Sequence, residues 1–330
     1  MRPLALALLL LLASCAALPT FTPAPPLPPG YGDTAGSLPL SAGARAPVRA
    51  WLPPGPPRAA ILALHGFNDS RDAWELPGPA FAAAGMALYA PDQRGFGAAP
   101  GRGSWPGAQT LADDAAAMLA DLRRRHPGLP VYAMGESMAG AVLMVLAAQD
   151  PAAADAWVLL SPALWGRQQQ GILLSSGLWI VSGLAPGLQV TGGEVRLRVV
   201  PSDNRDALLS LARNPLTIRR TRFDALRGLT DLMDAAQDSA GRLPPRTLVL
   251  YGDRDTIVPA PAVQRAWRAM PPHVRRALYS GGYHLLLRDL NRAAPTGDVI
   301  AWLSSPAQWL PSGADLAAAG WQAAPQPGRR

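Results

Sequence analysis

The sequence predicts an α/β domain in which helices flank a mostly parallel central sheet and a helical cap is inserted. Short apolar runs alternate with segments of helical length over residues 45–161 and again over 244–308. Strands and helices that alternate at this spacing form a parallel sheet covered on both faces. Between 162 and 243 the alternation stops, which predicts the cap insertion. The chain has 330 residues, 49% of them hydrophobic and 16% charged, so it is long and apolar enough to bury such a core.

Residues 1–14 are predicted to be a lipoprotein signal peptide. An uninterrupted apolar run over 4–13 is too short to span a bilayer and suits a signal-peptide core. The run ends in Leu-Ala-Ser-Cys at 12–15, which resembles the lipobox of bacterial lipoproteins. This resemblance implies cleavage before Cys15 and a stable anchor of acyl chains on Cys15. Ala16, in place of Asp, favours the periplasmic face of the outer membrane; the alternative is a plain secretory signal with an incidental cysteine.

Residues 15–44 are predicted to form a proline-rich tether, with folded sequence beginning near Arg45. Six prolines between 19 and 29 favour an extended, semi-rigid spacer that holds a domain away from a membrane. The alternative for this stretch is a disordered N-terminus.

The net charge of +7 comes from arginine, because the chain contains no lysine. The arginines are scattered, and no aromatic-interleaved basic stripe or nucleic-acid motif accompanies them. A solvated surface is therefore favoured over a nucleic-acid partner, and a bias towards a membrane surface is the alternative.

The apolar runs define the elements expected in the core. Strands are expected at 48–52, 59–64 and 86–90, from 131 onward, and at 156–160, 246–251 and 276–279. Helices are expected at 74–84, 110–125, 141–148 and 262–270, and around 299–303. These assignments follow hydrophobic periodicity, which separates strands from helices by the spacing of apolar residues. Residues 309–330, rich in Pro, Ala and Gly, are predicted to be a loose C-terminal tail.

Within the cap, residues 171–186 are strongly apolar. The segment has sixteen residues, which is short for a membrane span. It is expected to pack as the core of the cap, or to act as a lid that lines an acyl pocket or touches lipid. One helix can do both with different faces.

A strand–turn–helix sequence over 131–148 is where the chemistry is expected. Its turn reads Gly-Glu-Ser-Met-Ala over 135–139, so small residues stand two positions before and two after Ser137. Small residues there allow a strained turn that presents the hydroxyl at the start of a helix, whose dipole favours negative charge. This is the context of a nucleophile elbow, although Ala139 stands where the pattern has glycine. The alternative is an ordinary βα turn that contains serine.

A serine nucleophile needs a base within hydrogen-bond reach and a carboxylate that orients the base. The chain has four histidines, at 65, 126, 273 and 284. His65 and His126 precede Ser137 and are expected to be structural, and His273 lies in a Pro-Pro-His-Val connection. Only His284 stands in a glycine-rich loop after a late strand, where it can reach the carboxyl edge of the sheet. The sequence therefore predicts His284 as the base.

The orienting acid is expected in the loop after the preceding strand, where Asp253 and Asp255 both stand. One helix and one strand separate this loop from His284, so the two loops reach the same sheet edge. The order Ser, Asp, His along the chain is that of α/β-hydrolases. These observations leave the choice between the two aspartates open.

Together these segments resemble the α/β-hydrolase superfamily, in its branch of monoacylglycerol lipases, lysophospholipases and S33 serine aminopeptidases. The likeness covers about residues 45–305, and the segments that match are 65–67, 91–97, 135–138, 252–259 and 282–284. It implies Ser137 as nucleophile, His284 as base and Asp255 as orienting acid, because the family places the acid at the fourth position of Gly-x-x-Asp. It also implies that the amides of Phe67 and Met138 hold the oxyanion. Neither a metal nor an organic cofactor is implied.

The expected function is hydrolysis of a carboxylic ester through an acyl-enzyme, with monoacylglycerol or lysophospholipid as substrate. The apolar cap and the lipid anchor both favour a lipid substrate at a membrane. One alternative is a carboxylesterase or peptidase of the same superfamily that acts on a soluble substrate. A lipid acyltransferase with the same site is another. The third is a non-catalytic envelope lipoprotein that uses the fold to bind lipid, which the loss of a triad residue would favour; none is missing.

Overall fold

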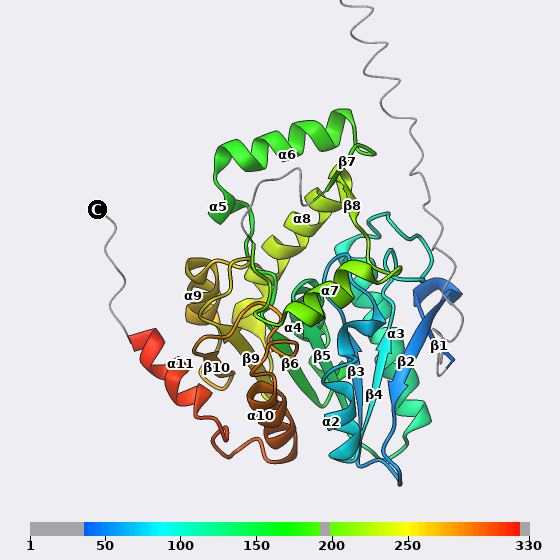
Figure 1. Ribbon diagram of the computed structural model, residues 1–330, viewed down its shortest axis with the longest axis vertical. Coiled ribbons are helices and arrows are strands. Elements are labelled where there is room, and N and C mark those ends of the chain that lie inside the picture. Colours follow the sequence, from blue (N-terminus) through cyan, green and yellow to red (C-terminus); the bar gives the residue numbers. More distant parts are fainter. Residues whose placement is uncertain (1–35, 192–198, 324–330) are drawn as a thin grey trace, which may run out of the picture.

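The computed structural model describes residues 36–191 and 199–323. An eight-stranded sheet runs through the middle of the molecule and carries helices on both faces (Figure 1). The strand order is β1-β2-β4-β3-β5-β6-β9-β10, and every pair from β4 to β10 is parallel. Strand β1 pairs with β2 in the antiparallel direction, and β2 pairs with β4 in the same way. The predicted mostly parallel α/β sheet is confirmed.

The strands agree closely with the apolar runs. Their bounds are β1 Ser37–Pro39, β2 Arg45–Trp51, β3 Ala59–Leu64, β4 Met86–Pro91, β5 Val131–Glu136, β6 Ala156–Leu160, β9 Thr247–Gly252 and β10 Arg275–Tyr279. Along β3, Ile61 and Ala63 face one hydrophobic cluster, whereas Leu62 and Leu64 face the other. This alternation follows from the two-residue period of a strand, and it places a core on each face of the sheet.

Helices cover both faces of the sheet. The core helices are α2 Gly78–Ala83, α3 Ala108–Arg125, α4 Met138–Gln149, α9 Ala260–Ala269, α10 Ala293–Ser304 and α11 Ala314–Ala323, with short 3-10 turns η2 Ser41–Gly43, η3 Arg71–Trp74, η4 Pro151–Ala153 and η5 Ala240–Arg242. The helix expected over 74–84 is split into η3 and α2. Pro77 and Pro79 explain the split, because proline cannot donate to the preceding turn and is tolerated only where a helix begins.

The predicted tether is wrong for residues 37–44, where the chain already belongs to the sheet. Ser37 pairs with Pro47 in the β1–β2 ladder, and Leu38 and Leu40 are buried in the larger core cluster. Leu38 lies within β1 and Leu40 directly follows it, so the two side chains reach the same core because every second residue of an extended chain faces one side. The predicted signal peptide, the lipidation site Cys15 and the rest of the tether up to residue 35 lie outside the described residues.

The predicted loose tail is wrong for α11, which packs against the edge strand β10. Its Trp321 ring lies 5.1 Å from the ring of Trp267 and 5.8 Å from that of Tyr251. Asp315, on the same helix, accepts a hydrogen bond of 2.5 Å from Arg275 on β10. A helix in this position covers an otherwise open sheet edge, so the alanine-rich segment is ordered by packing rather than by its own pattern.

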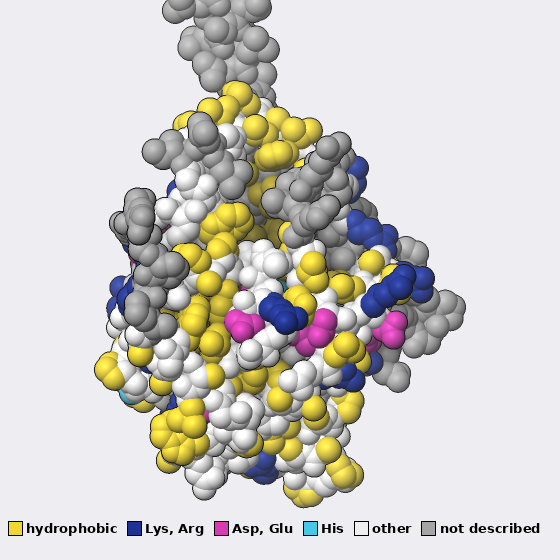
Figure 2. All heavy atoms as spheres, turned by 60° about the vertical axis from the view of Figure 1, so that its left-hand side comes forward, with side chains coloured by type: hydrophobic (Ala, Val, Ile, Leu, Met, Phe, Trp, Pro, Cys, Tyr) yellow, Lys and Arg dark blue, Asp and Glu magenta, His cyan; other side chains and the backbone are white. Residues whose placement is uncertain are grey.

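The cap between β6 and β9 contains α5 Arg167–Gln170, α6 Ile172–Leu184, α7 Arg205–Arg213 and α8 Phe223–Ser239, together with a small sheet of β7 Gln189–Thr191 and β8 Arg220–Arg222. Helix α8 packs against α4 and contributes Leu232 and Ala236 to the core. Helix α6 lies at the far end of the cap (Figure 1) and leaves Trp179, Ile180 and Leu184 more than half exposed. Hydrophobic side chains gather at this end of the molecule in Figure 2. Within 36–191 and 199–323, no helix is long and apolar enough to cross a membrane.

Candidate active site

Ser137 stands in a strained turn between β5 and α4. Its φ is 54° and its ψ is −113°, a conformation that a non-glycine residue holds only at a cost of about 1–3 kcal/mol. A Cβ added at Gly135 would lie 2.7 Å from the backbone of Ala139, and one added at Gly140 would lie 2.9 Å from Pro162. The turn therefore requires glycine at these positions. Ser137 is half-buried, whereas the residues on either side of it are buried.

His284 and Asp255 meet at the carboxyl end of the sheet. The Nδ1–H of His284 donates to Asp255 Oδ2 over 2.7 Å, and both side chains are buried. The other oxygen of Asp255 accepts from the amides of Ile257 and Val258, at 2.7 and 2.9 Å. Asp253 is exposed and accepts instead from the amide of Gly281. Of the two aspartates that the sequence left open, Asp255 is the one that contacts the imidazole.

Charge around His284 sets its protonation. Burial lowers the pKa of this imidazole, and the charge of Arg288 acts in the same direction, but the charge and hydrogen bond of Asp255 together with the carboxylate of Glu136 outweigh them. The net effect raises the pKa of His284 above its ordinary value. An imidazole held in this way accepts a proton readily and is stabilised once it is charged.

The loop after β3 lies directly against the serine. A Cβ built on Gly66 would be 3.4 Å from the Cβ of Ser137, so this loop and the elbow are in contact. The backbone amides of Phe67 and Met138 find no hydrogen-bond acceptor within the described part of the chain. Two free amides beside a serine hydroxyl are what an oxyanion hole requires.

A cavity of about 550 Å³ opens over Ser137 and His284. Core and cap residues line it together, and most of the lining is apolar: Phe67, Ala163, Trp165, Val199, Pro201, Leu211, Leu229, Met233, Ile257, Val258, Pro259 and Leu285. Its volume lies within the range of small-molecule sites. The cavity therefore suits an apolar substrate that presents one polar group to Ser137.

The other three histidines have structural partners. His65 Nδ1 donates to the Gly66 carbonyl over 2.8 Å, and its Nε2 accepts from the Gln93 amide over 3.1 Å. Burial lowers the pKa of His65, so the ring stays neutral in this loop, as expected for a structural histidine. His126 ends α3 and bonds to the Tyr89 hydroxyl, and His273 bonds to the carbonyl of Leu243.

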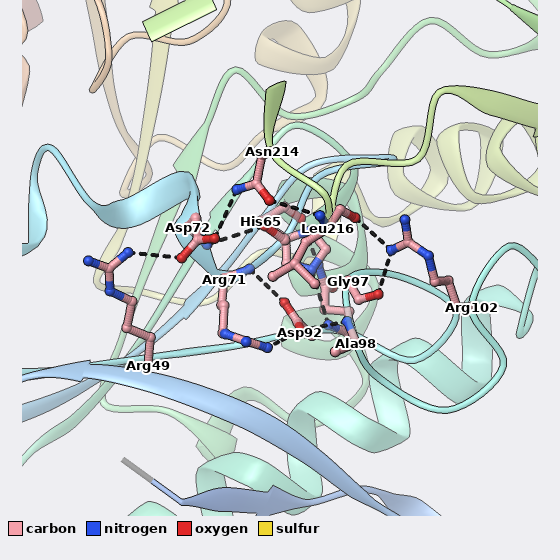
Figure 3. Close-up of polar contacts among 12 residues, drawn as sticks. Arg49, His65, Arg71, Asp72, Asp92, Gly97, Ala98, Arg102, Asn214 and Leu216 are labelled. Atoms are coloured by element: carbon pink, nitrogen blue, oxygen red, sulfur yellow. Dashed lines mark hydrogen bonds and ion pairs between the residues drawn. The ribbon is translucent and has the colours of Figure 1, made fainter. Parts of the chain in front are cut away.

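The loop after β4 is held in place by separate ion pairs of Asp92 and Arg94. Asp92 pairs with the buried Arg71 and also accepts from the Ala98 amide (Figure 3). Arg94 pairs with Asp114 on α3 at 2.8 Å. Arg102 extends from the same loop to the carbonyls of Gly97 and Leu216, which fastens the loop to the cap (Figure 3). These contacts hold the loop and do not reach Ser137.

The pattern of the family described as serine aminopeptidase, S33, matches residues 55–291. The chain belongs to this family. Among curated proteins it is 25% identical to the monoacylglycerol lipase of Mycolicibacterium smegmatis, over 80% of this chain and 94% of that one. It is also 25% identical to the human monoglyceride lipase, over 73% of this chain and 80% of the relative.

Solved structures of this superfamily share the fold at lower identity. The monoacylglycerol lipase of Paleococcus ferrophilus superposes with a TM-score of 0.67 at 21% identity, covering 79% of this chain and 98% of that one. A carboxyl esterase of Bacillus coagulans gives a TM-score of 0.66 at 18% identity, covering 81% of this chain and 96% of that one. With the sheet order and the flanking helices, these neighbours show an α/β-hydrolase fold.

One group of charged residues at the site of this S33 member is not among the residues expected from the sequence. Arg288, one turn after His284, donates to Asp69 and to Glu136. All three side chains are buried, and Asp69 and Glu136 line the cavity. Burial raises the pKa of Glu136, although the charge of Arg288 opposes the rise. One signal was available: an Arg-Asp pair directly follows three leucines after His284, where the apolar run indicates burial.

Proposed function

We propose that the protein is a serine hydrolase of carboxylic esters, with Ser137 as nucleophile, His284 as base and Asp255 as the acid that orients it. The observation that carries this proposal is the buried hydrogen bond between His284 and Asp255, at the mouth of an apolar cavity that also exposes the strained Ser137. A serine, a base and an orienting acid are the parts that nucleophilic acyl transfer needs.

The proposed reaction has two steps. His284 takes the hydroxyl proton of Ser137 as the oxygen attacks the ester carbonyl, and the amides of Phe67 and Met138 donate to the oxyanion. The C–O bond to the alcohol then breaks, and the alcohol leaves with the proton from His284. Water attacks the acyl-enzyme in the same manner and releases the acid. Each oxyanion donor is expected to contribute about 100-fold or more in rate.

The proposed substrate is monoacylglycerol or lysophospholipid. The apolar lining of the cavity supports an acyl chain, and the curated relatives are monoacylglycerol lipases. A carboxylesterase for short, soluble esters is the second candidate, because a carboxyl esterase shares the fold to nearly the same TM-score. The two candidates differ in their preference for chain length.

The test is hydrolysis of p-nitrophenyl esters from acetyl to palmitoyl by the full chain in detergent. We expect the rate to rise with chain length and to be lost in Ser137→Ala. The control is Ser304→Ala, which removes an exposed hydroxyl on α10. Activity confined to short esters would replace the lipase by a carboxylesterase, and equal activity in wild type and Ser137→Ala would refute the nucleophile.

The same proposal includes attachment to the membrane through a lipidated Cys15, with the enzyme in the cell envelope. Its support is the sequence over 4–15 alone. We expect the wild-type protein to enter the detergent phase of Triton X-114 and Cys15→Ser to stay in the aqueous phase. Ser137→Ala, which leaves the lipobox intact, is the control and should enter the detergent phase. An aqueous wild-type protein would refute the anchor.

A further inference from the structure

Arg288 links three segments of the site through one nitrogen. Its Nη2 donates to Asp69 Oδ2 over 2.5 Å and to Glu136 Oε1 over 2.6 Å. Asp69 lies 219 residues before Arg288 in the chain, and Glu136 lies 152 residues before it. The side chain of Arg288 is only 7% exposed, so water hardly screens these two contacts.

Each partner belongs to a segment that carries a group of the proposed reaction. Asp69 closes the loop that follows β3, where its amide donates to the Gly66 carbonyl and its carboxylate accepts from the Ser70 amide. Phe67 lies inside this closed turn. Glu136 is the last residue of β5 and directly precedes Ser137.

The third segment is the loop of the base. The Arg288 amide donates to the Leu285 carbonyl over 2.7 Å, which forms a turn directly after His284. The Arg288 carbonyl accepts from the Asn204 side chain of the cap over 2.8 Å. The backbone of Arg288 is therefore held on both sides, so the hydrogen bonds of its guanidinium connect Asp69 and Glu136 to the loop that carries His284.

Stability alone does not account for this arrangement. Two carboxylates share one guanidinium, which leaves an excess negative charge in a buried place if all three groups are ionised. Apolar side chains of similar volume often stabilise a protein as well as a buried ion pair, because charged groups lose their hydration on burial. Directed hydrogen bonds, in contrast, set the distance and the orientation of the groups that they join.

We propose that Arg288 is a positioning residue. By bonding to Asp69 and Glu136, it holds three segments at fixed distances from one another: the loop after β3 that carries Phe67, the turn that carries Ser137 and the loop that carries His284. This inference rests on the proposed function. Misplacement of reacting groups by about 1 Å can cost about 100-fold in rate, so loss of the bridge should lower kcat by this order. Arg288 is not among the residues that line the cavity, so KM should change by less than about threefold.

The charges of this group also act on His284. The charged groups that face the imidazole are Asp255, Glu136 and Arg288. The carboxylate of Glu136 raises the pKa of His284, so its removal in Glu136→Gln should lower that pKa. Because the neutral imidazole is the active form, the acid limb of the kcat profile should then move to lower pH. The amide oxygen of the variant can still accept from Arg288, so we expect the fold to be preserved.

The experiment compares Arg288→Met and Arg288→Lys with wild type, using p-nitrophenyl octanoate and thermal unfolding of the full chain. The control is Arg275→Met, which breaks a partly buried contact of 2.5 Å, to Asp315, on the edge strand. We expect Arg288→Met to lose about 100-fold in kcat with a nearly constant KM. Arg288→Lys should regain part of the loss, because it keeps the charge but not the planar guanidinium. Arg275→Met should lose thermal stability and keep its kcat.

A folded Arg288→Met with wild-type kcat, and a fall in stability like that of Arg275→Met, would overturn the inference. If Arg288→Met does not fold, Arg288→Lys and Glu136→Gln decide. A reduced kcat in the first and a shifted acid limb in the second support positioning, and wild-type values in both overturn it. Failure of the proposed function is distinct, because wild type and Ser137→Ala would then be equally active in the same assay.

Discussion

Helices α4 and α6 have similar compositions and opposite surroundings. Both are almost wholly apolar and lack a charged residue. Every residue of α4 from 138 to 147 is buried, whereas α6 leaves Trp179, Ile180 and Leu184 exposed by 60%, 51% and 66%. The sheet and α8 surround α4, while α6 contacts α5 and α8. An apolar helix is thus part of the rigid scaffold in the core, and in the cap it presents an apolar surface outward.

The difference separates two functions of the fold. The core region fixes the geometry of Ser137, because this residue caps the N-terminus of α4, which is closely packed in the core. The cap supplies apolar residues to the lining of the cavity. Three apolar side chains on α6, those of Trp179, Ile180 and Leu184, do not line the cavity and are exposed to solvent. The core should therefore be sensitive to small changes and the cap tolerant of them, which the following variants test.

The largest effect is expected in the core, for His284→Ala. Loss of the base should lower kcat by a factor on the order of 10⁴ or more, as for other triads. Steady-state kinetics on a p-nitrophenyl ester measure the loss, and circular dichroism checks the fold. His126→Ala, which removes a structural histidine from the end of α3, should keep its activity. Activity within tenfold of wild type in His284→Ala would exclude this residue as base.

The second-largest effect is expected for Leu143→Ala on α4, as a loss in the free energy of unfolding. Leu143 is fully buried, and truncation of a buried leucine costs about 2–5 kcal/mol through lost transfer energy and the cavity left behind. Urea unfolding measures this cost as a lower midpoint at constant slope. A loss under about 1 kcal/mol would mean that the core relaxes around the deletion and that the scaffold is less rigid than argued.

A smaller effect concerns pH. The active form carries neutral His284, so kcat/KM should rise with pH through a midpoint above 6.5, the ordinary pKa of histidine, because the pKa of His284 is raised. The folded state then binds this proton more tightly than the unfolded state, and the resulting stability is present at low pH and lost as pH rises through the midpoint. In Asp255→Asn the midpoint should fall, since burial remains and the raising charge is gone. A midpoint that is unchanged by this substitution would contradict the assigned pair.

The smallest effect is expected for Leu184→Ser on α6. The side chain is 66% exposed, so the free energy of unfolding should change by no more than about 0.5 kcal/mol. The same urea experiment as for Leu143→Ala gives a direct comparison of the two helices. A loss of 2 kcal/mol or more in Leu184→Ser would remove the distinction between core and cap.

Most elements of the core can be predicted from the local pattern of apolar and small residues in the sequence. The strand expected at 59–64 is found there because each of its residues is apolar and buried. The turn around Ser137 is predictable because a serine between small residues, after an apolar run and before a helix, permits few other conformations. The contact of Asp255 with His284 was expected from family resemblance, since spacing alone left Asp253 open.

What the sequence missed depends on contacts between distant segments. The partners of the Arg288 side chain are distant in the sequence, because Asp69 lies in the loop after β3 and Glu136 at the end of β5. The order of α11 comes from Trp321 packing on Tyr251 and Trp267, which no pattern within 314–323 reveals. Similarly, residues 37–39 form an edge strand only because β2 stands beside them.

The most direct test of the proposed nucleophile is covalent labelling by a fluorophosphonate, followed by mass spectrometry of the digested protein. An activated serine attacks the phosphorus and keeps the adduct, whatever ester the enzyme prefers. We predict a single adduct on Ser137, formed slowly in His284→Ala and absent from Ser137→Ala. An unlabelled wild-type protein, or an adduct at another residue that persists in Ser137→Ala, would contradict the assignment.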